Sequence, residues 1–134
     1  MFSKQSKPQN RIDSLIGAGT KIEGNLSFSG GLRIDGEVEG NVVAHPGKPS
    51  TLVLSEHARI DGEVSVTHMV INGVVTGPVS ASEYLELQSK AKVIGDVHYK
   101  SLEIQLGAII EGKLIHLADA SDKVVTLKLS GAES

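Results

Sequence analysis

A glycine flanked by aliphatic residues recurs at a nearly constant spacing along this chain, and this repeat restricts the possible folds more than any other feature. The last glycines of successive repeat units are Gly24, Gly40, Gly62, Gly77, Gly95 and Gly112, at intervals of 16, 22, 15, 18 and 17 residues. The longest interval contains residues 45–50, whose two prolines and one glycine predict a loop insertion. The remaining intervals indicate a structural unit of about 17 residues.

Within each unit the aliphatic and polar residues alternate with a period of two, which predicts short β-strands rather than helices. A unit of this length suits three short strands separated by three corners, and stacking such units buries a continuous core. The sequence therefore predicts an all-β fold, a single-stranded parallel β-helix of about six coils. Aromatic residues make up only 3% of the chain, so the core is expected to consist of branched aliphatic residues. The inward-facing core positions are expected to include Leu54, Ile60, Leu87, Val93, Ile104 and Ile110.

The repeat also predicts the organisation of the chain. We expect the β-helix to occupy residues 16–129, between a flexible N-terminal tail at 1–15 and a C-terminal tail at 130–134. No capping helix is predicted at either end, so the terminal coils are expected to expose strand edges and core to a neighbouring subunit. The residues expected at this polymerisation interface are Ile12, Leu15, Ile16, Val124, Val125, Leu127 and Leu129.

Composition excludes several classes of function. The chain has no cysteine, which removes thiolate metal sites and thiol nucleophiles. Its net charge of −3 and its interleaved charges offer no basic stripe for nucleic acid. No apolar run is long enough to span a bilayer, no signal peptide is visible, and no phosphate-binding loop is present. The five histidines lack the spacing of a metal site, so we expect no metal, no cofactor, no nucleotide and no catalytic residue.

The repeat from Ile22 to Leu114 resembles the bactofilin domain, and the first seven residues resemble the short membrane-targeting peptide of many bactofilins. The resemblance implies a right-handed β-helix that assembles end to end into non-polar filaments without nucleotide. It also implies a cytoskeletal protein at the inner face of the bacterial cytoplasmic membrane, which organises cell-wall synthesis or remodelling proteins. The membrane-binding residues implied by the resemblance are Met1, Phe2, Lys4 and Lys7. The expected partners are thus other copies of the chain, anionic lipid and cell-wall proteins.

Two alternatives remain open from the sequence. The six-residue steps from Leu54 to Ile60 and from Leu87 to Val93 are compatible with a left-handed hexapeptide-repeat acyltransferase. The two shorter units interrupt these steps, which favours the non-enzymatic interpretation. A β-helix that does not polymerise is the second alternative, and filaments seen by electron microscopy would exclude it.

Overall fold

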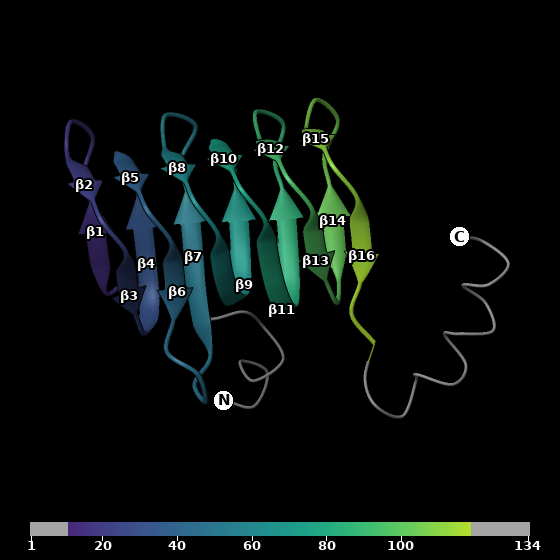
Figure 1. The fold of residues 1–134 in the computed structure, drawn as a ribbon, viewed down its shortest axis with the longest axis horizontal. Helices are drawn as coiled ribbons and strands as arrows, with labels where there is room; N and C mark the ends of the chain where they lie inside the picture. Colours follow the sequence, from purple (N-terminus) through teal and green to yellow (C-terminus); the bar gives the residue numbers. More distant parts are fainter. Residues whose placement is uncertain (1–10, 119–134) are drawn as a thin grey trace, which may run out of the picture.

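The computed structural model describes residues 11–118, and every regular element in this range is a β-strand (Figure 1). The strands are β1 (Ser14–Ile16), β2 (Lys21–Glu23), β3 (Leu26–Phe28), β4 (Gly30–Ile34), β5 (Glu37–Glu39), β6 (Val42–Ala44), β7 (Ser50–Leu54), β8 (Arg59–Asp61), β9 (Val64–Ile71), β10 (Val74–Thr76), β11 (Val79–Leu87), β12 (Lys92–Ile94), β13 (Val97–Tyr99), β14 (Leu102–Ile104), β15 (Ile109–Glu111) and β16 (Leu114–His116). All of their pairings are parallel, so the predicted parallel β-solenoid of about six coils is confirmed. The first strand begins at Ser14, two residues before the predicted start of the domain.

The strands form three faces that run along the solenoid axis. The first face contains β1, β4, β7, the second half of β9, the second half of β11, and β14. The second face contains β2, β5, β8, β10, β12 and β15. The third face contains β3, β6, the first half of β9, the first half of β11, β13 and β16. One coil thus consists of one strand from each face, and Figure 1 shows the six coils side by side.

The corner between the first and second faces explains why the sequence contains units of two lengths. Four coils turn through a four-residue segment, at residues 17–20, 55–58, 88–91 and 105–108. The second and fourth coils use a shorter corner at 35–36 and 72–73. In the short corner the amides of Asp35 and Gly36 both donate to the carbonyl of Ile16 in the coil before, at 2.7 and 3.2 Å. The short corner at 35–36 therefore lies inside the wider turn at 17–20 of the coil before it.

The corner between the second and third faces is built from the recurring glycines of the sequence. All six have positive φ, from 134° at Gly24 to 159° at Gly112, a conformation that side chains with a Cβ rarely adopt. They also stack on one another, since a Cβ added to Gly95 would lie 2.7 Å from the carbonyl carbon of Gly77. The repeat is thus required both by the backbone conformation and by the close approach of successive coils.

The corner between the third and first faces holds the predicted insertion. Residues 45–49 form a turn between β6 and β7, whereas β9 and β11 pass through the same corner as continuous strands. Next to this loop Ser50 and Thr67 join adjacent coils by reciprocal hydrogen bonds. The Ser50 amide donates to Thr67 Oγ1 at 2.7 Å, and the Thr67 amide donates to Ser50 Oγ at 3.1 Å. The insertion is therefore accommodated without loss of register.

The core is one ladder of aliphatic residues that points inward from all three faces. Leu54, Ile60, Leu87 and Val93, which the sequence places in the core, are almost completely buried. Burial of a side chain of this kind contributes about 1.5–3 kcal/mol relative to exposure. The ladder fills the interior, so the functional surfaces are the outer faces and the two ends.

Candidate functional site: the open ends of the solenoid

The C-terminal end of the described structure leaves the core ladder uncovered. Ile104 in β14 is 46% exposed and Leu114 in β16 is 47% exposed, although both occupy inward positions. Their register partners one coil earlier, Leu87 and Val97, are 0% exposed. Ile104 is therefore exposed rather than buried within residues 11–118, and Ile110 is only partly buried, because no further coil among these described residues covers them.

Further apolar side chains surround this open end. Leu106 is 96% exposed at the tip of the last four-residue turn, and Ile109 is exposed beside it on β15. Ile94, one coil below, is also exposed at the edge of the second face. Leu106, Ile109 and Leu114 were not among the interface residues predicted from the sequence, and their exposure makes them candidates. The available signal was that they belong to the last complete repeat unit, because the next glycine, Gly131, is followed two residues later by Glu133 and not by an aliphatic residue.

The N-terminal end is formed by β1, β2 and β3. Of the residues predicted at the interface here, Ile12 and Leu15 are exposed, whereas Ile16 points inward and is 9% exposed. Leu15 occupies the outward position of β1, so it lies at the rim of this end rather than within its core. The inward residues Ile22 and Leu26 are half-buried, because among the described residues only the second coil covers them.

The chain just before β1 is fixed to the second coil by Asp13. The Asp13 amide donates to the Gly31 carbonyl at 2.8 Å, and the Gly31 amide donates to Asp13 Oδ2 at 2.9 Å. Arg11 Nε pairs with Asp13 Oδ1 at 2.9 Å. These interactions, the Gly31 hydrogen bond first, lower the pKa of Asp13. The N-terminal coil therefore presents an ordered edge.

Both ends present strand edges that can extend the sheets. In the described structure β1, β2 and β3 pair only with strands of the second coil. Similarly, β14, β15 and β16 pair only with strands of the fifth coil. A row of unpaired backbone N–H and C=O groups beside exposed aliphatic residues is a template for further strand pairing.

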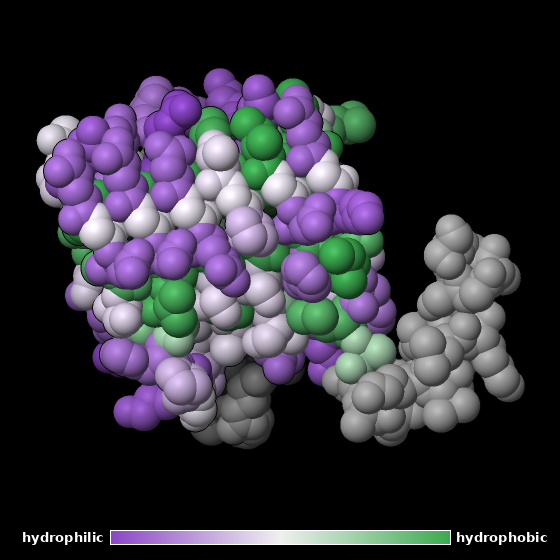
Figure 2. Space-filling view, viewed as in Figure 1, coloured by the Kyte–Doolittle hydropathy of each residue, from purple (hydrophilic) through white to green (hydrophobic). Residues whose placement is uncertain are grey.

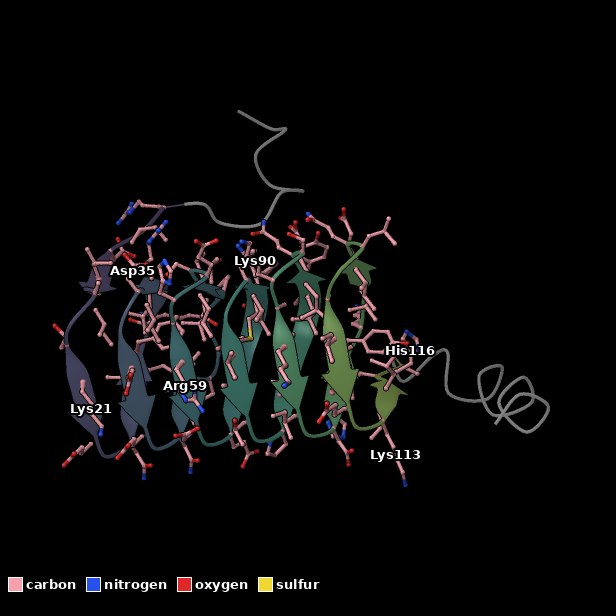
Figure 3. The ribbon with its side chains drawn as sticks, turned by 90° about the horizontal axis from the view of Figure 1, so that it is seen from above. Lys21, Asp35, Arg59, Lys90, Lys113 and His116 are labelled. Atoms are coloured by element: carbon pink, nitrogen blue, oxygen red, sulfur yellow. The ribbon has the colours of Figure 1, made fainter. Side chains whose placement is uncertain are left out.

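The lateral surfaces have a different character, with charged side chains that project outward along the length of the solenoid (Figure 3). On the second face Lys21 Nζ lies 2.9 Å from Glu39 Oε2 and 3.8 Å from Glu23 Oε2. The hydrogen bond to Glu39 is the main cause of the raised pKa of Lys21. The hydrophilic residues in the space-filling view cover much of the visible side, with smaller apolar areas between them (Figure 2). The visible side is therefore largely hydrophilic, and among residues 11–118 the largest group of exposed aliphatic residues is at the C-terminal end.

One polar cluster lies on the first face beside the open C-terminal end. Glu86 and Glu103 are register partners, and the Tyr84 hydroxyl donates to Oε1 of both, at 2.9 Å to Glu103 and 3.4 Å to Glu86. The side-chain amides of Gln88 and Gln105 donate to Glu86 Oε2 at 3.3 and 3.2 Å. Burial, and next the hydrogen bond to Glu103, raise the pKa of Tyr84 to about 12. This cluster places two carboxylates in adjacent coils.

The histidines offer no metal centre within residues 11–118, where no group of three or more histidine or acidic side chains is arranged to hold an ion. His57 Nε2 lies 3.4 Å from Glu56 Oε2 at an exposed turn. His116 Nε2 donates a hydrogen bond to the Lys100 carbonyl at 3.0 Å, and the centre of its ring lies 5.4 Å from that of the Tyr99 ring. The contacts of His116 join neighbouring coils, whereas that of His57 lies within one turn.

Two groups of predicted residues lie outside the described residues. They are the membrane-binding set Met1, Phe2, Lys4 and Lys7, and the C-terminal interface set Val124, Val125, Leu127 and Leu129. Both sets stay predictions. Within residues 11–118 no helix has the length and hydropathy needed to cross a membrane.

The fold and its ends define a class of protein, a parallel β-solenoid whose terminal coils are open to strand addition. Residues 14–115 match the family model described as Bactofilin, polymer-forming cytoskeletal. The chain therefore belongs to the bactofilin family, which confirms the resemblance seen in the sequence. This family is cytoskeletal and structural in character, which is consistent with a non-enzymatic protein.

Two curated relatives come from Myxococcus xanthus (strain DK1622). Bactofilin BacP is 26% identical over 113 residues, which cover 84% of this chain and 45% of BacP. Bactofilin BacO is 26% identical over 102 residues, which cover 76% of this chain and 78% of BacO. The chain thus matches somewhat less than half of the length of BacP. No solved structure matches the chain significantly.

Proposed function

We propose that this protein polymerises end to end into filaments without nucleotide and serves as a scaffold rather than an enzyme. The observation that carries the proposal is the open last coil, where the inward residues Ile104 and Leu114 are about half exposed beside unpaired strand edges. Membership of a polymer-forming family supports the same conclusion. The junction would contain the last coil of one subunit, and the residues Ile12, Leu15 and Ile16 at the opposite end are the second candidate junction surface.

The energetics favour association at the ends over association at the sides. Completing the burial of two half-exposed aliphatic side chains contributes about 1–2 kcal/mol each, and Leu106 and Ile109 add to this. Strand pairing across the junction would also satisfy backbone groups that otherwise need water. On the charged second face, by contrast, association would have to desolvate ion pairs such as Lys21–Glu39, which is costly.

Replacing Leu114 with arginine tests this proposal. The charge would lie on the uncovered core of the last coil, where a second subunit could bury it only at a cost of several kcal/mol. Filaments seen by electron microscopy and sedimentation should therefore be lost in Leu114→Arg, while the β-type circular dichroism spectrum is retained. Val43→Arg is the matched control, since Val43 is similarly exposed at 40% but points outward from the side of the second coil.

Filaments in Leu114→Arg equal to those of the unmodified protein would place the junction elsewhere. Loss of filaments in both variants would show that association through the third face is essential. Discrete trimers of the unmodified protein would contradict a scaffold and would favour the hexapeptide-repeat acyltransferase.

We further propose that the N-terminal tail attaches these filaments to the inner face of the bacterial cytoplasmic membrane, where they position cell-wall proteins. The apolar side chains of Met1 and Phe2 and the charges of Lys4 and Lys7 support this proposal. Each basic residue near an anionic leaflet contributes about 1 kcal/mol, so one tail is a weak anchor. A filament carries many tails, and their effective concentration converts weak contacts into firm attachment.

A further inference from the structure

One inward column of the third face changes from apolar residues to a histidine at the last described coil. Tyr99 and His116 are register partners in this column, and so are Ala81 and Tyr99. The same position in the earlier coils is occupied by buried or half-buried apolar residues, namely Phe28, Ala44 and Val66. His116 is therefore the one member of this column that gains a charge near neutral pH.

The imidazole of His116 lies on the coil below it. Nε2 donates to the Lys100 carbonyl at 3.0 Å, and the ring plane is tilted by 57° to that of Tyr99. His116 is nevertheless exposed within residues 11–118, whereas Ala81 in the same column is 0% exposed. Figure 3 shows His116 at the C-terminal end of the described structure. A subunit that stacked on the last coil would therefore cover this imidazole.

The charged groups around this corner belong to the coils below His116. Lys100 Nζ lies 3.9 Å from Glu83 Oε1, so these two side chains form an ion pair. His98 occupies the outward position next to Tyr99, and its register partner on β16 is the uncharged Ile115. Within residues 11–118 no carboxylate lies within ion-pair distance of the His116 ring. A proton on His116 would therefore add a positive charge without a counter-ion.

We propose that protonation of His116 weakens the subunit junction, so that assembly is favoured at neutral pH and opposed at mildly acidic pH. This inference rests on the proposed function, because the covered imidazole belongs to the proposed junction. A neutral imidazole can be buried with Nε2 still bonded to Lys100, whereas burial of a charge without a partner is strongly unfavourable. Because the assembled state prefers the neutral form, association is strongest above the titration range of histidine and falls as the pH drops through it.

The test measures the protein concentration at which the full chain begins to assemble, at pH 8 and at pH 5.5. At about one pH unit below the ordinary histidine value of about 6.5, each imidazole buried in a junction lowers the association constant about tenfold. The threshold concentration should therefore rise about tenfold at pH 5.5, which still lies above the usual range in which carboxylates take up protons. Sedimentation over a concentration series gives the threshold, and electron microscopy distinguishes filaments from amorphous precipitate.

Two neutral variants identify His116 as the titrating group. His116→Gln keeps a donor for the Lys100 carbonyl, and His116→Phe repeats the residue type of Phe28 in the same column. Both variants should assemble with equal thresholds at the two pH values. His98→Gln is the matched control, because it also removes one histidine but at an outward position of the adjacent coil, and it should keep the tenfold rise. Circular dichroism at both pH values shows whether each variant is folded.

The outcomes separate this inference from the proposed function. Filaments of the unmodified protein with an equal threshold at both pH values, or a lower one at pH 5.5, overturn the role of His116 and leave the proposed function intact. A rise that persists in both His116 variants, or that disappears in His98→Gln, overturns it as well, because the proton then binds elsewhere. If the unmodified protein forms no filaments at either pH, the proposed function fails, and the role of His116 fails with it.

Discussion

Leu87 and Ile104 occupy the same inward position in neighbouring coils and are register partners, yet Leu87 is 0% exposed and Ile104 is 46% exposed. The two residues have similar size and polarity, and both strands pair in parallel. Only the presence of a covering coil distinguishes them. The proposed junction surface is therefore an interrupted core, made of the same types of residue that stabilise the middle of the solenoid.

Truncation of Leu87 and of Ile104 should consequently have unequal effects on folding. Leu87→Ala removes a fully buried aliphatic side chain and should lower the free energy of unfolding by about 2–5 kcal/mol. Ile104→Ala removes a side chain that is already half solvated and should cost the unassembled protein distinctly less. Chemical unfolding of both variants under non-assembling conditions measures the difference. Equal losses would mean that Ile104 is covered in the isolated subunit, and would contradict an open last coil.

The stacked glycines should be intolerant of a Cβ. Gly95→Ala places a methyl group 2.7 Å from the Gly77 carbonyl carbon at a φ of 148°, so it should lower the free energy of unfolding by at least about 1–3 kcal/mol. Gly17→Ala is the matched control, because a Cβ at Gly17 meets nothing within 4 Å. Thermal denaturation followed by circular dichroism compares the two. A neutral Gly95→Ala variant would show that adjacent coils can separate at this corner.

The phenol of Tyr84 should lose its proton only at an unusually high pH. Burial and the hydrogen bond to Glu103 raise its pKa to about 12, from the ordinary value of 10. The raised pKa means that the folded state prefers the neutral phenol, so the stabilisation is complete below pH 10 and is lost as the pH rises towards 12. In a Tyr99→Phe variant the ultraviolet absorbance of phenolate reports Tyr84 alone within residues 11–118, where it is then the remaining tyrosine.

Replacing Glu103 with glutamine in that background removes the charged acceptor, so the pKa of Tyr84 should fall. A midpoint near 10 in the folded Tyr99→Phe protein would show that the contacts of Tyr84 with Glu103 and Glu86 do not persist in solution.

The membrane proposal predicts that attachment depends on the tail and on assembly together. Phe2→Ala should release the protein from anionic liposomes while its filaments persist, because it removes apolar insertion only. The double variant Lys4→Ser, Lys7→Ser should weaken liposome binding most at low salt. At high salt the attraction between lysine and anionic lipid is already screened in the unmodified protein. Co-sedimentation with liposomes measures both, with Lys48→Ser on the exposed loop at 45–49 as a control. Full binding by Phe2→Ala would rule out the tail as the anchor, and full binding by the unassembled Leu114→Arg variant would rule out avidity.

The sequence alone determined the repeat and therefore the fold. Period-two alternation requires strands, and a positive φ at the corner of every coil requires glycine, so both features are visible as residue types at fixed spacing. The insertion at residues 45–49 was equally visible, because proline and glycine mark it. These properties are local, which is why no structure was needed to predict them.

Only the tertiary structure decided which inward residues are covered. Ile104 and Leu114 carry the same pattern as Leu87 and Val97, and a pattern of residue types contains no information on whether another coil follows. The alignment of Glu86 with Glu103, and the contact of both with Tyr84, likewise depends on register between coils 17 residues apart rather than on any local motif. Exposure at the ends arises from the stacking of coils, which is a property of the whole solenoid.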